Sequence, residues 1–208
     1  KIQLKKVLLR VFYQIFYFMK QITRPVYVLL VSLFFFASCS SNDQFEISKN
    51  KVGKLNASTT IQEIETLFKN DSIVKHLSEG VLGYNGTYSQ DEDKYHIYSE
   101  AGKHLLTITP KESLDSLSTI KYVDIFDAKF TTKEGIGLNS TFEEINFLTH
   151  IAKVDATFTK VLLYMDKLNA TFSLPKDAVG LKPMSTGTIQ IDQIPNKVKP
   201  VSFVVWFE

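Results

Sequence analysis

The sequence predicts an α+β fold, in which two short helices pack on one face of a curved antiparallel sheet. Two observations lead to this prediction: a helix-start pattern occurs twice, and a strand–turn–strand pattern follows each copy. Helices on one face of an antiparallel sheet bury the apolar surfaces of both layers. The chain is therefore expected to contain duplicated units, each with one helix followed by antiparallel strands.

The helix-start pattern begins with a threonine in both copies. Thr60 is followed three residues later by Glu63, and Thr141 is followed by Glu144. In such a capping box the hydroxyl and the carboxylate satisfy the free backbone N–H groups of a helix start. Apolar residues then recur at helical spacing, which predicts an amphipathic helix of about ten residues in each copy.

Residues 94–110 and 160–175 are predicted to form matching hairpins, because each combines two strand-like runs with a central turn and ends in proline. Residues 119–126 alternate in polarity and predict a half-buried strand. A short strand is expected at 188–191 and a strong one at 201–207. The last is so apolar that we expect it inside the sheet, because a free edge of that kind would promote aggregation.

The beginning of the chain has the layout of a signal peptide. Lys20 and Arg24 precede an apolar run at residues 26–37, which ends in small residues before Cys39, the only cysteine. Residues 36–39 resemble the lipobox of bacterial lipoproteins, which implies cleavage between Ser38 and Cys39 and lipidation of the new N-terminal cysteine.

The alternative is a free thiol at Cys39 beside a single transmembrane anchor. The apolar run at 26–37 has 12 residues, and a membrane-spanning helix needs roughly 20. The length therefore favours cleavage and a lipid anchor.

These patterns divide the chain into four segments. Residues 1–38 are predicted to be the signal peptide, and 39–48 the lipidated tether. Within the signal peptide, 1–18 is either an upstream extension before a true start at Met19 or a long basic region. Residues 49–132 form the first repeat unit with a linking strand, and 133–208 form the second repeat unit with the C-terminal strands.

Removal of residues 1–38 changes the charge, because six of the 24 basic residues leave and no acidic residue does. The remaining 18 basic and 22 acidic residues give a net charge of −4. Nucleic acid is therefore not an expected partner. The serine at position 40, directly after the cysteine, resembles the residue found there in lipoproteins that are sent to the outer membrane. Residues 41–46 resemble the acidic surface-export signal of Bacteroidota-type lipoproteins. We expect an outer-membrane lipoprotein that faces either the periplasm or the cell surface.

The duplicated units at residues 53–110 and 135–174 resemble the β-lactamase inhibitor protein family and the single unit of small outer-membrane assembly lipoproteins. The assembly lipoproteins usually have glycine and methionine before the threonine. Residues 56–58 and 138–140 depart from that pattern. The resemblance therefore implies an architecture and assigns no functional residue.

Catalytic and metal-binding patterns are missing from the sequence. His76, His96, His104 and His150 lack the spacing of zinc ligands. His96 and His104 face each other across a predicted hairpin, either as a metal pair or as an exposed cross-strand pair. Residues 91–93 are acidic but lack the alternating calcium-loop pattern, and no nucleophile or phosphate-loop motif occurs. We therefore predict no catalytic residue, no metal and no cofactor.

These observations favour a non-enzymatic binding or assembly module of the cell envelope, attached to the membrane through Cys39, with a protein partner or a small ligand. Two alternatives stay open: a hydrolase with unrecognised carboxylates, which would need two acids in one cleft, and a purely structural envelope protein. A structure can separate them by an exposed apolar face, a buried carboxylate pair or a featureless polar surface.

The segment between the glutamate of the capping box and the start of the predicted hairpin is fifteen residues longer in the first unit than in the second. The extra residues lie around 75–88, where Asn85 and Gly86 indicate a two-residue hairpin turn. We predict Tyr84 and Tyr88 as partner contacts, because tyrosine offers contact area at low entropic cost. The alternative is an added hairpin that only widens the sheet.

Overall fold

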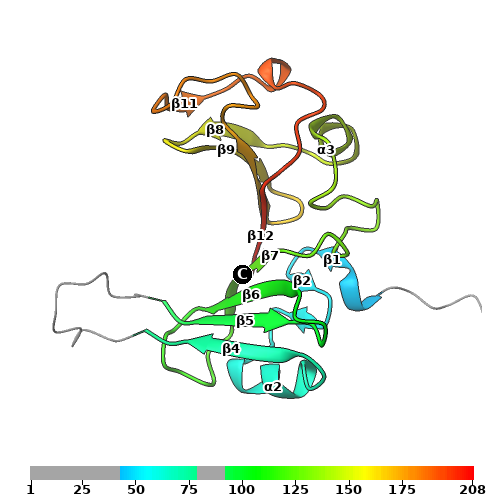
Figure 1. Ribbon diagram of the computed structural model, residues 1–208, viewed down its shortest axis with the longest axis vertical. Helices are drawn as coiled ribbons and strands as arrows, with labels where there is room; N and C mark the ends of the chain where they lie inside the picture. The colour runs from blue at the N-terminus through cyan, green and yellow to red at the C-terminus, as the bar shows by residue number, and fades with distance from the viewer. Residues whose placement is uncertain (1–42, 79–91) are drawn as a thin grey trace, which may run out of the picture. The chain divides into compact units, whose positions relative to one another are not determined.

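The computed structural model describes residues 43–78 and 92–208, which form a mostly β structure (Figure 1). A small antiparallel sheet contains three two-residue strands: β1 (Ile47–Ser48), β2 (Lys51–Val52) and β3 (Leu55–Asn56). A nine-stranded antiparallel sheet has the order β11-β8-β9-β10-β12-β7-β6-β5-β4. Its strands are β4 (Ser72–His76), β5 (Lys94–Tyr98), β6 (His104–Pro110), β7 (Ile120–Ile125), β8 (Lys153–Ala156), β9 (Lys160–Met165), β10 (Ala170–Pro175), β11 (Gly187–Thr188) and β12 (Ser202–Trp206).

The predicted α+β class with two helices packed on a sheet is wrong. The first capping box opens only a 3-10 turn, η2 (Ile61–Glu63), and a four-residue α-helix, α2 (Ile64–Leu67). Among the described residues, α3 (Phe142–Leu148) is the only α-helix longer than four residues. The remaining helical pieces are the 3-10 turns η1 (Asp43–Phe45) and η4 (Ile191–Gln193).

Both helices are shorter than predicted because the backbone leaves the helical region soon after the start. At the end of α2, Phe68 has φ −111° and ψ 32°. At the end of α3, Thr149 is extended, with φ −125° and ψ 164°, and its hydroxyl donates to the Ile145 carbonyl. The Thr149 N–H donates to the same carbonyl over 2.9 Å, so α3 ends with its last backbone bond made and the next residue extended.

The two predicted hairpins are confirmed. β5 pairs with β6 around the turn that contains Gly102, whose φ is +76°. β9 pairs with β10 around residues 166–169, where Asn169 has φ +50°. Glycine and asparagine tolerate this left-handed conformation better than other residues, so both turns lie where the sequence placed them.

β12 lies inside the nine-stranded sheet, as predicted. It pairs on one side with β10, through Phe172 opposite Phe203, and on the other with β7, through Val123 opposite Val205. The strands of the first hairpin and those of the second are thereby joined into one sheet. The β12–β7 pair is the junction of the two halves.

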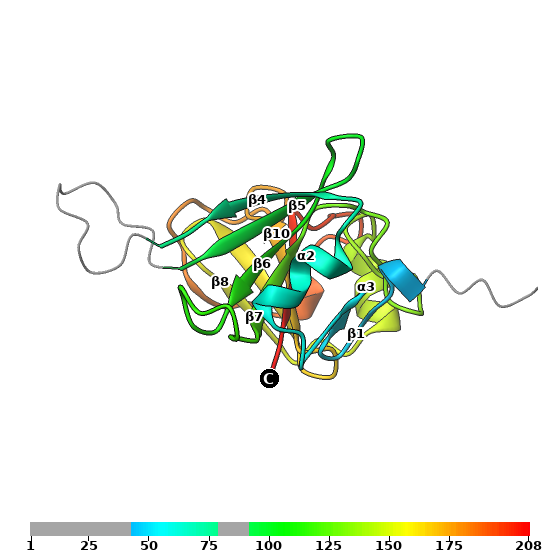
Figure 2. The same cartoon turned by 90° about the horizontal axis from the view of Figure 1, so that it is seen from below.

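One face of this sheet carries the core. The rings of Phe172 and Phe203 stack with centroids 4.0 Å apart, and both are fully buried. Ile64 of α2, Ile145 of α3 and Leu55 of β3 belong to the same buried cluster. Figure 2 shows α2, α3 and β1 gathered on one side of the strands. The helices and the small sheet therefore cover this face.

The folded part includes residues that the sequence assigned to a tether. Ile47 is buried, and Phe45 packs edge-on against Phe130 with centroids 5.2 Å apart. Gly53 has φ +56°, and a Cβ at this position would collide with the Gln44 carbonyl. This close approach holds the first turn of the described chain against the small sheet.

Candidate binding surface

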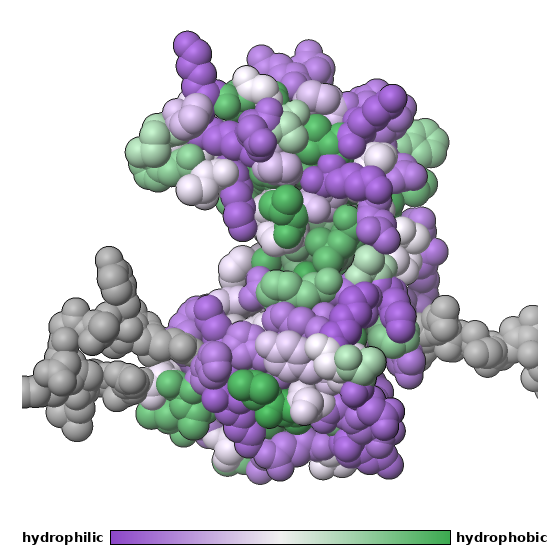
Figure 3. Space-filling model, viewed as in Figure 1, coloured by the Kyte–Doolittle hydropathy of each residue, from purple (hydrophilic) through white to green (hydrophobic). Residues whose placement is uncertain are grey.

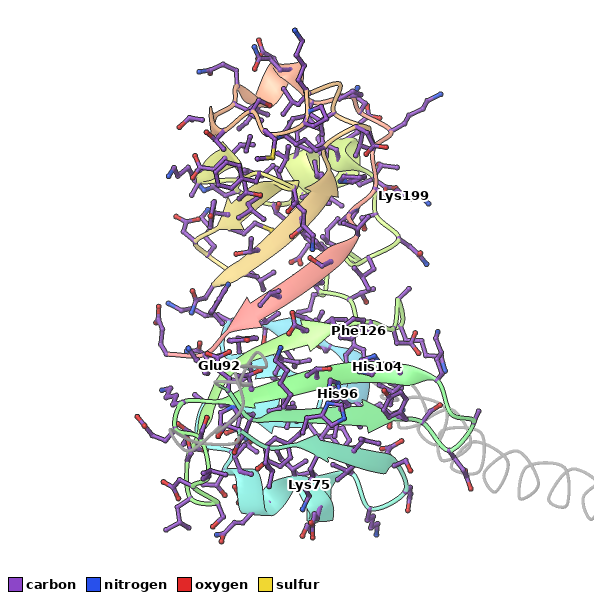
Figure 4. The ribbon with its side chains drawn as sticks, turned by 60° about the vertical axis from the view of Figure 1, so that its left-hand side comes forward. Lys75, Glu92, His96, His104, Phe126 and Lys199 are labelled. Carbon is purple, nitrogen blue, oxygen red and sulfur yellow. The ribbon has the colours of Figure 1, made fainter. Side chains whose placement is uncertain are left out.

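The other face of the nine-stranded sheet, here called the open face, is built from the residues that alternate with the core. One row of directly opposed residues crosses eight strands. From β4 to β8 the row is Val74, His96, Thr107, Asp124, Val204, Thr171, Tyr164 and Lys153. Figure 4 looks onto this face, and Figure 3 shows a hollow at the left of the described part with hydrophobic side chains inside it.

A cluster of aromatic rings covers the open face over β5, β6 and the end of β7. The His104 ring stacks on Phe126 with centroids 4.1 Å apart and on Tyr98 at 4.7 Å. His96 lies 5.5 Å from His104, and His76 lies 4.8 Å from His96. Figure 4 shows His96 and His104 on adjacent strands with Phe126 nearby. Half of the Phe126 side chain stays exposed, so the cluster offers a free apolar edge.

His96 and His104 share one hydrogen-bond partner. Nδ1 of His96 lies 2.9 Å from Thr107 Oγ1, and Nε2 of His104 lies 3.0 Å from the same oxygen. Burial lowers the pKa of His96, and the charges of His76, His104 and Lys94 lower it further. Burial also lowers the pKa of His104. Both rings therefore favour the neutral form more strongly than a free histidine does.

A second aromatic pair lies at the β12–β7 junction. The rings of Tyr122 and Trp206 are 5.0 Å apart, and the Trp206 indole N–H donates to Thr171 Oγ1 over 3.1 Å. The Tyr122 hydroxyl donates to Glu92 Oε2 over 2.9 Å. Glu92 is also paired with Lys121 at 2.6 Å. The two rings are thus fixed in place by polar bonds at their edges.

Asp124 lies near the middle of the open face, opposite Thr107 on one side and Val204 on the other. Burial raises the pKa of its carboxyl, against the opposing effect of Lys94 and Lys160. Lys160 belongs to β9, so its charge acts on Asp124 across β10 and β12. A partly desolvated acid of this kind on an exposed face marks a candidate functional residue.

The residues that the sequence singled out lie in several places. Ser38, Cys39, Tyr84 and Tyr88 lie outside the described residues. His150 is remote from the other three histidines in the sheet and pairs with Asp166 at 3.1 Å. Within residues 43–78 and 92–208, no group of three or more His, Cys, Asp or Glu side chains could hold a metal ion.

Asp93, which lies in the described part of the acidic run at 91–93, stabilises the fold. Asp93 is buried, and its two carboxylate oxygens accept the backbone N–H groups of Ser78 and Leu114, each over 2.7 Å. Asp127 is also buried, and its Oδ1 accepts from Lys103 and from the Lys129 N–H. Both oxygens of Asp93 are thus bonded, which is the geometry of a structural carboxylate, whereas Oδ2 of Asp127 is buried without a hydrogen-bond partner among the described residues.

Sequence reasoning missed Tyr122, Asp124, Phe126 and Trp206 as surface residues. The signal was present, because these residues alternate with the buried Val123, Ile125, Phe203 and Val205 in two predicted strands. Alternation places residues on a common face. It does not tell which face the helices leave uncovered.

Comparison of the chain with protein-family models, curated proteins and solved structures finds no match. The resemblance to the β-lactamase inhibitor protein family therefore gains no support from known structures. No helix in the described part of the chain has the length and apolar character to cross a membrane.

Proposed function

We propose that the protein is a lipid-anchored binding module of the cell envelope, which holds a protein partner on its open face. The observation that carries the proposal is the row of opposed residues across eight strands, flanked by two aromatic clusters. Trp206 is 39% exposed and Phe126 is 50% exposed, so both keep apolar area available for a partner.

The composition of this face favours a protein over other ligands. Interface centres are rich in aromatic residues and poor in unpaired charge, and tryptophan and tyrosine dominate binding energies. Two ion pairs lie at the margins of the open face, Glu92 with Lys121 at 2.6 Å and Asp155 with Lys153 at 2.5 Å. A nucleic acid would instead require a basic surface, and Asp124 occupies the centre of this one.

The enzyme hypothesis has less support. A hydrolase of the type considered from the sequence needs two carboxylates that converge on a substrate. The buried acids Asp93 and Asp127 are bound to backbone and lysine donors instead. Attachment through lipid on Cys39 at the outer membrane, facing the periplasm or the cell surface, completes the proposal and rests on the lipobox pattern.

The test begins with a photo-crosslinking amino acid at Val204, in the middle of the open face, in cells that make the full chain. The matched control places the same amino acid at Phe158, which is 62% exposed in the turn between β8 and β9. The expected result is a discrete protein adduct from position 204 and none from position 158. The adduct is identified by mass spectrometry, and the partner is then purified.

The second step measures the affinity of that purified partner for a Phe126→Ala, Trp206→Ala double variant. Loss of two aromatic anchors should weaken binding at least about 30-fold, which corresponds to 2 kcal/mol. The Phe158→Ala variant should bind as the wild type does. Unchanged affinity in the double variant, or an adduct with glycan or lipid instead of protein, would refute the proposal.

A further inference from the structure

A groove on the covered side of the molecule combines exposed apolar residues with lysines. It has a volume of about 560 Å³ and lies between the β1–β2 turn, residues 132–134, the end of α3 and the β9–β10 turn. Phe147 and Leu148 of α3 line it, and their side chains are 86% and 43% exposed. Three lysines, Lys49, Lys133 and Lys167, and one acid, Glu134, line it as well. We call this region the α3 groove.

Packing in the core does not explain why α3 carries a phenylalanine at position 147. On α3 the buried residues are Phe142 and Ile145, whereas Phe147 points out of the core. A single exposed apolar residue is ordinary. Here, however, a second apolar residue and three lysines from three other segments surround the same hollow. Aromatic side chains flanked by lysines suit the boundary between lipid headgroups and acyl chains.

The lysines are held loosely enough to contact another anion. Lys49 lies 3.4 Å from Glu208, and both side chains are at least half exposed. Lys133 lies 3.8 Å from Glu46, with 74% of the lysine side chain exposed. Exposed pairs of this kind contribute little to stability. A phosphate group can therefore replace the carboxylate at small cost.

The chain between Cys39, the predicted site of lipid attachment, and the first described residue is short, and this limits how far the groove can lie from a bilayer. Four residue steps separate Cys39 from Asp43, the first described residue, and a fully extended chain spans about 14 Å in four steps. Ile47 and Ser48, which line the groove, follow only four and five residues later. Figures 1 and 2 both show η1, where the described chain starts, on the same side as α3 and β1.

We infer that the α3 groove is the membrane-facing surface of the protein, with Phe147 and Leu148 in the interfacial layer of a phospholipid bilayer and Lys49, Lys133 and Lys167 on lipid phosphates. The inference rests on the proposed lipid anchor at Cys39. It adds a definite orientation: the groove faces the lipid, and the open face, on the other side of the sheet from α3 and β1, points away from it (Figure 1). The partner then approaches from the aqueous side.

The experiment uses the full lipidated protein in vesicles of phosphatidylethanolamine and phosphatidylglycerol in a 3:1 ratio, chosen as about a quarter anionic lipid. Because Cys39 is the only cysteine and its sulfur carries the lipid, Phe147→Cys supplies the only free thiol for an environment-sensitive fluorophore. The matched control is Phe158→Cys, another exposed phenylalanine outside the groove. A nitroxide lipid labelled near the headgroup serves as quencher.

We expect at least twofold stronger quenching, and a bluer emission, at position 147 than at position 158. Lys133→Gln together with Lys167→Gln should reduce the quenching at position 147, while an unchanged circular dichroism spectrum shows that the fold is kept. Equal quenching at both positions, or stronger quenching at position 158, would overturn the inference.

Vesicle flotation of the same samples separates this inference from the anchor. If the labelled protein floats with the vesicles and position 147 is not quenched, the anchor holds and the orientation is wrong. If the protein stays at the bottom of the gradient, the lipid anchor of the proposed function has failed. Partner capture by the open face is measured independently through Val204 and decides the remaining part of that proposal.

Discussion

The ring of Tyr122 lies 5.0 Å from the indole of Trp206, across the pair of strands at which the two halves of the sheet meet. Trp206 is the only tryptophan of the chain. Its fluorescence therefore reports on this junction alone, whereas circular dichroism reports on all strands.

The first prediction is that both signals change at the same urea concentration. β12 pairs with a strand of each half, and one continuous core runs under both, so the halves should unfold together. Coincident transitions are the mark of two-state unfolding. A tryptophan midpoint clearly below the circular dichroism midpoint would mean that the junction opens before the halves unfold.

The second prediction concerns the free energy of unfolding at acidic pH. The pKa values of His96 and His104 are lowered in the folded state, so between those values and about 6.5 the unfolded chain binds more protons. The free energy of unfolding should therefore fall as pH drops below about 6.5 and level off once both rings are protonated. His76 and Lys94, which face His96, add repulsion in the same direction.

Urea titrations at several pH values measure this effect. The His96→Gln, His104→Gln variant should lose most of the slope between pH 6.5 and pH 5. His150→Gln, which changes a histidine paired with Asp166 at the surface, should keep it. A slope that survives in the double variant would place the acid-sensitive groups elsewhere.

The third prediction separates the two capping boxes, which the sequence treats as equivalent. Thr141 Oγ1 accepts the Glu144 N–H over 3.3 Å. At the first box the Glu63 N–H donates to the Thr60 backbone carbonyl instead, over 3.1 Å. Thr141→Ala should therefore cost about 1 kcal/mol of unfolding free energy, and Thr60→Ala clearly less.

Chemical denaturation of both variants decides this point, with Thr141→Ser as the control that keeps the hydroxyl. Both boxes share their other half, because each glutamate accepts the backbone N–H of its threonine, over 2.7 and 2.8 Å. Equal losses in the two alanine variants would show that this shared half, and not the threonine hydroxyl, fixes the helix start.

The fourth prediction concerns a buried lysine. The Lys176 side chain is buried, and its ammonium donates to the carbonyls of Thr157, at 2.9 Å, of Phe158, at 3.3 Å, and of Ser185. It thus joins the β8–β9 turn to the loop before β11. Lys176→Met should cost about 1–3 kcal/mol, because it leaves these carbonyls without a donor.

Urea denaturation measures the loss, and hydrogen exchange should show faster exchange near residue 185. The control is Lys182→Met, the same change at an exposed position in the same loop, which should be close to neutral. Equal effects of the two changes would mean that the Lys176 ammonium does not hold the loop.

The hairpins and the central position of β12 could be predicted from the sequence because their signals are local. Gly102 and Asn169 mark the turns, and the flanking residues alternate. The small sheet could not be predicted, since strands of two residues such as Ile47–Ser48 are too short to show a period. The helices were overestimated because a capping box marks a start and carries no information about length.

The open face could be foreseen only in part. Alternation groups Tyr122, Asp124 and Phe126 on one side of their strand, but the covering of the opposite side depends on contacts between distant segments, such as Ile64 of α2 with the sheet. The stacking of His104 on Phe126 also joins separate strands. Such contacts follow from strand order, which the sequence pattern alone does not give.

The place of β12 between β7 and β10 has a consequence for how the chain is made. Until residue 206 has been synthesised, β7 and β10 each present an unpaired edge beside a finished hairpin. Such edges pair readily with another chain, so two nascent molecules could exchange their last strands and emerge as an interlocked dimer. Rapid closure by β12 therefore protects each newly made molecule from its neighbours, and slow closure would favour exchange of the last strand between molecules.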